Sequence, residues 1–230
     1  MPPIENQLIT RLPRPSRLSL MKLCKPVPLT MAEVLSDGGK PIRYVYFPIE
    51  GFISLVTRLD GKPVLEVGMV GREGMIGAQM ALGVTREPLH AVVQGPGSAW
   101  RCGQLAFRSE LARNKALQQS LSRYLHVTMT QLAGSAACLR FHQIGPRLAR
   151  WLLMSQDRAH SESFRVTHEF LAFMLGVRRV GITTAAAALQ RQGLVRYSRG
   201  DITVLDRQGL KAAACSCYES DRKTYAELLN

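Results

Sequence analysis

Long apolar stretches are missing from this chain of 230 residues. No segment approaches the roughly 20 consecutive apolar residues that a membrane-spanning helix needs. Residues 1–17 hold four prolines and several basic side chains instead of the apolar centre of a signal peptide. Cysteines are few and odd in number, five in all, which fits a reducing compartment. These absences predict a cytoplasmic protein with no membrane partner, whose residues 1–27 form a flexible basic arm.

Clusters of metal ligands are also missing from the sequence. Cys215 and Cys217 are the only close pair of cysteines, and no second cluster completes a zinc or iron–sulfur motif. We interpret Cys24, Cys102 and Cys138 as small apolar packing residues rather than as redox sensors. The sequence therefore predicts no metal site and no bound cofactor.

Acidic residues are in short supply. Lys and Arg number 30 against 17 Asp and Glu, which leaves a net charge of +13 and a pI near 10.1. This balance favours an anionic partner, either nucleic acid or an acidic membrane surface. With 46% hydrophobic residues, the chain can bury a sizeable core in two domains or in one large domain.

Residues 28–107 are rich in β-branched and aromatic side chains and are interrupted by Gly and Pro. Several short strands at this spacing predict an antiparallel barrel or sandwich. The sequence DGK at 60–62 is a strong hairpin signal, and 48–51 and GPG at 95–97 are interpreted as turns. The predicted strands occupy residues 43–48, 51–59, 63–70, 90–94 and 98–102.

Proline is absent from residues 104–139, and apolar or small side chains recur there at steps of three and four. This spacing predicts one continuous helix with a single stripe. Such a stripe can pack on its own chain, but a long helix between two compact regions favours contact with a second copy. We therefore interpret 108–139 as a dimerisation helix. Its predicted contact residues are Leu121, Leu125, Thr128, Leu132, Ser135 and Leu139.

The spacing of residues 166–191 is that of a helix-turn-helix. Thr167 can cap a first helix, and Gly176 can adopt the positive φ that ends it. A second helix over 178–191 would place one apolar face against the first helix and leave the other face outward. The inward residues are Ile182, Ala185, Ala186 and Leu189, and the outward residues are Arg179, Thr183, Thr184 and Gln190.

Further elements surround this pair of helices. A helix over 147–159 is expected before it, and LVRYSRGDITVL at 194–205 predicts two strands directly after it. Two such strands form the wing of a winged helix-turn-helix domain, here predicted over residues 140–212. Residues 140–211 hold twelve Lys and Arg against five Asp and Glu, so seven of the thirteen net positive charges lie here. The combination predicts binding to double-stranded DNA.

Arg178 and Arg179 stand at the start of the second helix, where a positive charge opposes the helix dipole by about 0.3–1 kcal/mol. An arginine at this end of a recognition helix can bond two acceptors of guanine, which contributes about 1–3 kcal/mol of discrimination. The second effect is larger, so we interpret the pair as DNA-binding, the alternative being a solvated helix start. The predicted DNA-binding residues are Arg147, Thr167, His168, Arg178, Arg179, Val180, Thr183, Thr184, Gln190, Arg191 and Arg199.

The order of these parts, with FLAFMLGVRRVGITTAAAALQRQGLVRYSRGDITVLD at 170–206, resembles the Crp/Fnr family of bacterial transcription regulators. The likeness covers residues 28–212 and is looser at YFPIEGFISLV and VGREGMIGAQMALG. It implies an α+β fold with an antiparallel β-roll like that of cyclic-nucleotide-binding domains, a long dimerisation helix and a C-terminal winged helix-turn-helix. It further implies a homodimer that binds a two-fold related DNA site, contacts RNA polymerase and has no enzymatic activity.

The same resemblance puts Arg179, Val180 and Thr184 at the positions from which the family reads bases. Members that respond to cyclic AMP carry Glu where this chain has Val180, which implies a different target sequence. The expected division of the chain is an arm at 1–27, a sensor-like β-roll at 28–107, the dimerisation helix at 108–139, the DNA-binding domain at 140–212 and a tail at 213–230.

The sensor half departs from the cyclic-nucleotide pattern. Family members that bind these ligands have a Gly-Glu pair for the ribose and a later Arg-Ser or Arg-Thr pair for the cyclic phosphate. This chain has GA at 77–78 and PL at 88–89 instead, with Arg86 and Glu87 nearby in swapped order. Loss of both polar ligands removes the charge-assisted contacts, so we expect no response to cyclic AMP.

Other regulatory inputs stay open. An unidentified ligand, a redox change or a protein partner at the β-roll could control the regulator, and His90 or His126 could ligate haem. Oxygen-sensing family members use several N-terminal cysteines, and only Cys24 lies in that region. A remote alternative is a cupin-like metalloenzyme, which needs clustered His and carboxylate ligands, whereas residues 28–107 hold a single histidine, His90.

Overall fold

A computed structural model describes residues 6–58, 64–159, 161–198 and 200–229. The chain divides into two compact units. Unit 1 comprises Met1–Leu55, Met69–Thr130 and Thr224–Asn230, and unit 2 comprises Val56–Gly68 and Gln131–Lys223. Each unit has its own buried apolar residues and is described by itself.

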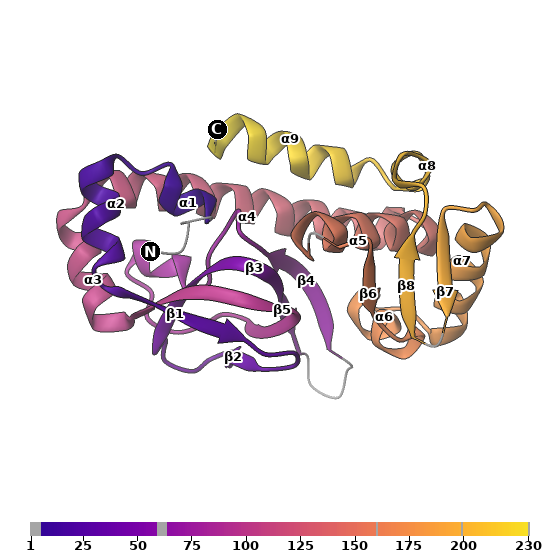
Figure 1. Cartoon of the computed structure of the whole chain (residues 1–230), viewed down its shortest axis with the longest axis horizontal. Helices are drawn as coiled ribbons and strands as arrows, with labels where there is room; N and C mark the ends of the chain where they lie inside the picture. Colours follow the sequence, from indigo (N-terminus) through magenta and orange to yellow (C-terminus); the bar gives the residue numbers. More distant parts are fainter. Residues whose placement is uncertain (1–5, 59–63, 160, 199, 230) are drawn as a thin grey trace. The chain divides into compact units, whose positions relative to one another are not determined.

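The sheet that includes the strands of unit 1 is antiparallel in its described registers, as expected for the β-roll (Figure 1). Its main path runs β1-β5-β3-β4, and β2 pairs with β5. A 3-10 helix, η1, covers Ala78–Leu82. The strands are β1 Cys24–Leu29, β2 Val34–Ser36, β3 Tyr44–Thr57, β4 Leu65–Val70 and β5 His90–Gly103.

Two predicted turns are wrong, because β3 and β5 each run unbroken through them. Gly51, Gly95 and Gly97 allow the backbones of the two strands to approach closely instead. A Cβ at Gly97 would lie 2.2 Å from the Glu50 carbonyl oxygen, and one at Gly51, whose φ is +77°, would lie 2.2 Å from the Gly95 carbonyl oxygen. The predicted hairpin at 60–62 lies outside the described residues.

The described part of the predicted flexible arm is folded, which corrects that prediction. Helices α1 (Gln7–Thr10) and α2 (Arg14–Met21) precede β1. Asn6 is fully buried, and its Nδ2 donates to the carbonyl oxygens of Pro48 and Gly74, each at 2.9 Å. The apolar side chains of this segment enter the core of unit 1. The sequence pattern missed them because prolines and basic residues interrupt their apolar stripe. The buried apolar side chains include Leu8, Ile9, Leu12, Leu20 and Met21.

The predicted continuous helix is two helices, α3 (Gln104–Arg113) and α4 (Lys115–Phe141). Asn114 separates them, and its side-chain oxygen accepts a hydrogen bond from Leu117 N at 3.1 Å. Leu121 is fully buried in the core of unit 1. It therefore cannot contact a second copy, which corrects its assignment to the dimer interface. Leu125, Thr128, Leu132 and Ser135 are half-buried, and Leu139 is exposed.

Unit 2 contains the predicted helix-turn-helix and wing, preceded by α5 (Ile144–Ala159). The predicted helix over 147–159 is present, and its buried side chains include Leu148, Trp151, Leu152 and Ser155. The pair of helices is α6 (His168–Leu175) and α7 (Arg179–Arg191). The wing hairpin is β7 (Val195–Ser198) and β8 (Asp201–Val204), and a short strand that the sequence pattern missed, β6 (Ser163–Arg165), pairs with β8.

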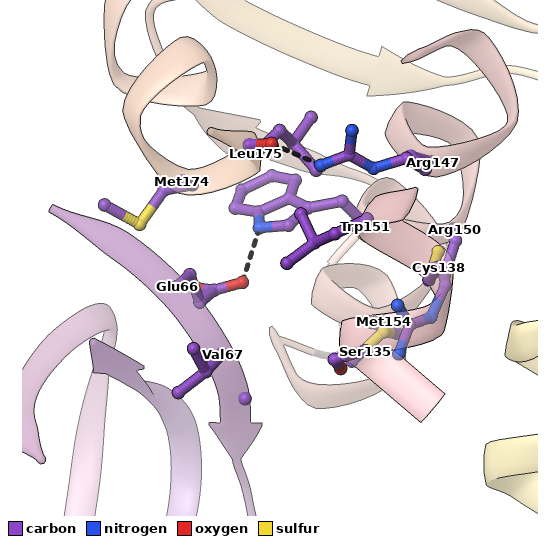
Figure 2. A pocket seen from close by; sticks show the side chains of 12 residues that line it. Glu66, Val67, Ser135, Cys138, Arg147, Arg150, Trp151, Met154, Met174 and Leu175 are labelled. Atoms are coloured by element: carbon purple, nitrogen blue, oxygen red, sulfur yellow. Dashed lines mark hydrogen bonds between the residues drawn. The ribbon is translucent and has the colours of Figure 1, made fainter. Parts of the chain in front are cut away.

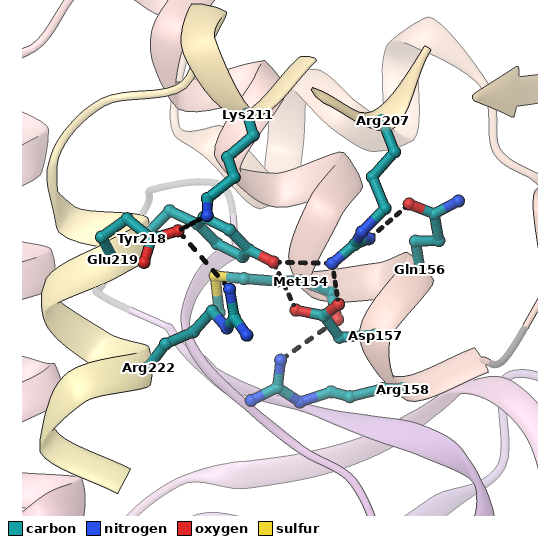
Figure 3. A network of polar contacts seen from close by, with 9 residues as sticks. All are labelled: Met154, Gln156, Asp157, Arg158, Arg207, Lys211, Tyr218, Glu219 and Arg222. Carbon is teal, nitrogen blue, oxygen red and sulfur yellow. Dashed lines mark hydrogen bonds and ion pairs between the residues drawn. The ribbon is translucent and has the colours of Figure 1, made fainter. Parts of the chain in front are cut away.

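Two helices follow the wing. Helix α8 (Arg207–Ala213) begins at Asp206, whose side chain accepts from Gly209 N at 2.9 Å, and α9 covers Cys217–Leu229. Figure 3 shows the polar network that joins these helices to α5. Asp157 accepts hydrogen bonds from Arg207 Nη2 at 2.5 Å and from Tyr218 Oη at 2.8 Å. Burial, followed by the bond to Asp157, raises the pKa of Tyr218 to about 12.

Among the described residues, no single helix is long and apolar enough to cross a bilayer. Only α6 and α7 taken together reach that length and composition, and they are bent by 109°.

Candidate nucleic-acid interface

Helix α6 begins and ends at the residues that the sequence predicts. The hydroxyl of Thr167 accepts a hydrogen bond from Phe170 N at 3.1 Å, which satisfies one of the first backbone donors of the helix. Gly176 follows the last turn with φ +62°, a conformation that a side chain would oppose. The chain then turns by 109° into α7. These two local signals set the angle between the helices.

Helix α7 has one buried and one exposed face, as predicted. Ile182, Ala185, Ala186 and Leu189 are buried. The exposed face collects the side chains expected to read DNA, and Val180 keeps 69% of its surface exposed although it is apolar. Val180 is therefore accessible to a partner at the start of α7. The exposed residues are Arg178, Arg179, Val180, Thr183, Thr184, Gln190 and Arg191.

The start of α7 is open to an anion. Among the described residues, no side chain caps this helix, and its first turn holds no acidic residue. The unpaired backbone N–H groups and the positive end of the helix dipole favour a negative charge at this position. Arg178 and Arg179 add two cations there. The arrangement is unfavourable for an isolated helix and favourable for one whose start meets a phosphate or the acceptor edge of a base.

His168 connects both helices and the wing. Its Nδ1 lies 3.0 Å from the Thr183 hydroxyl of α7, and its ring stacks on Tyr197 of β7 at 4.3 Å between centroids. Tyr197 Oη in turn donates to the Val166 carbonyl at 2.9 Å. Burial and then the charge of Arg179 lower the pKa of His168, so the ring stays neutral at neutral pH. Half-buried His168 therefore holds α7 against the wing.

Gln190 also anchors the wing. Its side-chain oxygen accepts a hydrogen bond from the backbone N–H of Tyr197 at 2.8 Å. That oxygen is engaged within the chain, so any contact of Gln190 with DNA falls to its amide nitrogen. Sequence reasoning missed Tyr197, for which the only signal was an aromatic residue within the first wing strand. Arg199 lies outside the described residues.

Arg147 was predicted to bind DNA, and the structure corrects this. The side chain is buried, and its guanidinium donates a hydrogen bond to the Leu175 carbonyl at the end of α6 (Figure 2). A cation at this carbonyl satisfies an acceptor that the helix itself leaves open. In the same cavity lining, Trp151 Nε1 donates to Glu66 Oε1 at 2.9 Å. Arg147 is a structural residue that holds α5 to α6.

The residues that the sequence analysis compared with a cyclic-nucleotide site lie in and after η1. Ala78 is buried, and the neighbouring Gln79 donates from Nε2 to Glu87 Oε2 at 2.7 Å. Arg86 is exposed and donates to the Gly39 carbonyl at 2.8 Å. Burial raises the pKa of Glu87, and the bond from Gln79 partly offsets that effect. Arg86 and Glu87 Oε2 are thus engaged with the protein, whereas Glu87 Oε1 is buried without a hydrogen-bond partner among the described residues.

The comparisons agree with this architecture. Residues 146–213 match the family model of the Crp-like helix-turn-helix domain. No curated protein matches the chain.

Solved structures share the fold over most of the chain. A transcriptional regulator of the Crp/Fnr family from Eubacterium rectale has a TM-score of 0.70 at 15% identity and covers 90% of this chain and 96% of its own. The c-di-GMP-responsive global regulator CLP of Xanthomonas campestris has a TM-score of 0.66 at 16% identity, with 84% and 99% covered. FixK2 from Bradyrhizobium japonicum has a TM-score of 0.64 at 17% identity, with 84% and 98% covered.

These findings bear on the alternatives that the sequence left open. The family-model match falls on the helices and wing whose exposed face carries the arginine pair. The shared fold also extends over the β-roll. The domain match makes residues 146–213 a Crp-like helix-turn-helix domain, and the fold of the chain is that of solved structures of Crp/Fnr-type transcriptional regulators.

Proposed function

We propose that the chain acts in the cytoplasm as a homodimer that binds a two-fold related DNA site through α7 and changes transcription by contact with RNA polymerase. One observation carries the proposal: α7 buries one face completely and exposes Arg178, Arg179, Val180 and Thr184 at its start. In this proposal, 28–107 is the sensor-like part, 108–139 supplies the dimer contact and 140–212 binds DNA. The tail, 213–230, buttresses the DNA-binding part.

Arg179 is assigned to base reading and Arg178 to phosphate. Consecutive helical residues point about 100° apart, so both guanidinium groups cannot enter the groove in the same direction. Arg178 precedes the helix as its N-cap residue and has an extended backbone. We therefore assign it to a phosphate at the edge of the DNA groove. Val180 offers an apolar surface, which suits the methyl group of thymine. The proposed half-site thus contains a guanine beside a thymine.

The dimer contact is assigned to the exposed face of α4. Met129 keeps 64% of its surface exposed, and Ala133, Ala136 and Arg140 follow it at helical spacing. Small residues along this line permit a second helix to approach closely. The contact predicted from the sequence therefore shifts to the neighbouring face, with Leu139 at its edge. Leu125, Thr128, Leu132 and Ser135 would border it.

Cyclic AMP is not the effector in this proposal. Ala78 replaces the carboxylate that would bond the ribose, Arg86 donates to the Gly39 carbonyl, and Glu87 Oε2 accepts from Gln79. A cyclic phosphate would have to break these contacts without gaining a charge-assisted bond to a preformed ligand. The expected outcome is equal DNA affinity with and without cyclic AMP.

The test is enrichment of random DNA duplexes on the purified chain, followed by sequencing. We expect a two-fold symmetric consensus, and Arg179→Ala should lose preference at one base pair per half-site. Loss of a bidentate arginine–guanine contact costs about 1–3 kcal/mol, equivalent to about 5–150-fold in affinity for the preferred sequence. Arg108→Ala is the matched control, because Arg108 is an exposed arginine of α3.

Two outcomes would contradict the proposal. Enrichment without any consensus would show that the bound DNA is held by charge alone. A consensus that is the same in the Arg179→Ala variant would show that α7 does not read the bases through this residue.

A further inference from the structure

Three thiols and one imidazole come together in unit 2. Cys138 lies in the last turn of α4 and His142 directly follows that helix, while Cys215 and Cys217 flank the start of α9. The Sγ atoms of Cys138 and Cys215 are 3.6 Å apart, and Cys217 Sγ lies 3.5 Å from His142 Nδ1. All four of these atoms lie within 4.8 Å of one another. More than 70 residues separate the two halves of the cluster.

Local structure presents each half as a chelating pair. Cys138 and His142 are four residues apart, and the hydrogen bond from His142 N to the Cys138 carbonyl, 3.1 Å, continues the helical turn between them. Residues four apart lie on the same side of a helix. Cys215 and Cys217 are held at the turn into α9, where Tyr218 N donates to the Cys215 carbonyl at 3.1 Å. Both pairs therefore present their ligand atoms before any ion binds.

The distances match a tetrahedral ion. Zn²⁺ binds thiolate sulfur at about 2.3 Å and imidazole nitrogen at about 2.0–2.1 Å. At tetrahedral angles, two such sulfurs lie about 3.8 Å apart, and a sulfur and a nitrogen lie about 3.5 Å apart. Two separations in the cluster, 3.6 Å between the Cys138 and Cys215 sulfurs and 3.5 Å between Cys217 Sγ and His142 Nδ1, are close to these values. Iron–sulfur clusters contain several atoms and would require the four ligand atoms to stand further apart.

Burial and charge suit a structural ion. Cys138 and Cys215 are buried, and Cys217 and His142 are half-buried. Three thiolates around Zn²⁺ leave one negative charge, which needs a nearby cation. Arg147 and Arg150 line the same cavity as Cys138, and Asp221 of α9 pairs with Arg150 at 2.6 Å.

We propose that Cys138, His142, Cys215 and Cys217 bind one Zn²⁺ that ties the end of α4 to the start of α9. All four coordination positions come from the protein, which is typical of a structural site rather than a catalytic one. This assignment replaces the expectation of no metal, which rested on Cys215 and Cys217 having no partner pair in the sequence. It also gives Cys138 a role beyond packing. The site is independent of the proposed reading of DNA.

The first experiment measures the zinc content of the full chain purified without chelator by elemental analysis. About one zinc per chain is expected. Cys217→Ser should lose the metal. Because Cys217 is half-buried and lies at the start of a helix, we expect this substitution to disturb the fold little. Cys24→Ser is the matched control, because Cys24 is also half-buried but lies in β1. The control should retain the zinc.

A second readout uses Co²⁺ on the reduced, metal-stripped chain. Tetrahedral thiolate ligation should give the intense visible bands of Co²⁺ in the wild type and in Cys24→Ser. Loss of a residue that only hydrogen-bonds to a metal ligand weakens metal binding about 10–100-fold. Loss of the Cys217 ligand itself should therefore weaken Co²⁺ binding at least about 100-fold. A chelator should also lower the melting temperature of the wild type, and leave that of Cys217→Ser unchanged.

Three results would overturn the proposal. One is a reduced wild-type chain that takes up neither zinc nor Co²⁺. Another is equal metal content in the wild type and Cys217→Ser. The third is a chain isolated under reducing conditions with a brown iron–sulfur chromophore or with a Cys138–Cys215 disulfide, since either would occupy the same sulfurs. DNA enrichment gives a separate result in each of these cases, so failure of the zinc site and failure of the proposed DNA binding can be told apart.

Discussion

At the scale of single residues, His168 shows how a side chain predicted to bind DNA also holds the domain together. Its Nδ1 meets Thr183, and its Nε2 is buried without a partner among the described residues. A proton on Nε2 would therefore have no acceptor. Burial and the nearby charge of Arg179 lower its pKa for the same reason.

The resulting prediction concerns pH. Unfolded His168 takes up a proton near its ordinary value of 6.5, whereas the folded chain resists protonation. The contribution of His168 to the unfolding free energy should accordingly be fully present above this pH, and the unfolding free energy should fall as the pH drops below it. His168→Gln should reduce this pH dependence in urea unfolding. His126→Gln, a change at an exposed histidine of α4, is the control, and equal pH profiles in the wild type and His168→Gln would refute the assignment.

At the scale of elements, the long strands β3 and β5 depend on glycines that the sequence pattern presented as turns. A methyl group at Gly97 would lie 2.2 Å from the Glu50 carbonyl oxygen, and backbone atoms cannot yield as a side chain can. Gly97→Ala should therefore lower the unfolding free energy by about 1–3 kcal/mol. Gly145→Ala, at a helical position with nothing within 4 Å, should cause no loss. Urea unfolding of both variants tests this prediction. Equal unfolding midpoints for Gly97→Ala and the wild type would contradict the close approach of β3 and β5.

Helix α4 carries a second prediction at this scale. Its exposed line of Met129, Ala133, Ala136 and Arg140 is the proposed dimer contact. Ala136→Glu puts an unpaired charge into that contact while leaving the fold intact, because Ala136 is exposed. Light scattering should show a dimer for the wild type and a larger monomer fraction for Ala136→Glu. Ala112→Glu, an exposed alanine of α3, should stay dimeric, and an unchanged dimer in Ala136→Glu would rule out this face.

At the scale of the whole molecule, the basic charge overstates the number of phosphate contacts. Arg147 is buried against a carbonyl, Arg150 pairs with Asp221, and Arg207 pairs with Asp157. Lys211 pairs with Glu219. Among the described residues of 140–211, exposed arginines therefore supply the charge that is available to phosphates, and these include Arg178, Arg179, Arg191 and Arg196. Salt dependence of DNA affinity should reflect this smaller set.

Arg191 makes that expectation measurable. It is exposed in the last turn of α7, where a phosphate contact carries no base preference. Arg191→Ala should weaken binding to all sequences alike and reduce the slope of log affinity against log salt by about 0.9. Arg108→Ala should leave the slope unchanged in the same titration. A lost base preference in Arg191→Ala, with an unchanged slope, would move this residue to the base-reading set.

Local sequence determined the helix-turn-helix and its wing. Thr167 as a cap, Gly176 at positive φ and the inward spacing of Ile182, Ala185 and Leu189 all act within a few residues, so their signals survive without knowledge of the fold. The exposed arginine pair follows from the same spacing. The alternating strands of the β-roll were visible for the same reason, although their ends were not.

Only the tertiary structure decided which side chains meet across long separations in the chain. Leu121 enters its own core, Arg147 reaches the end of α6, and Gly97 lies against Glu50. Likewise, Cys138 joins a pair of cysteines more than 70 residues away. Periodicity reports the face of an element but not what packs on that face, because the partner is chosen by the folding of the whole chain.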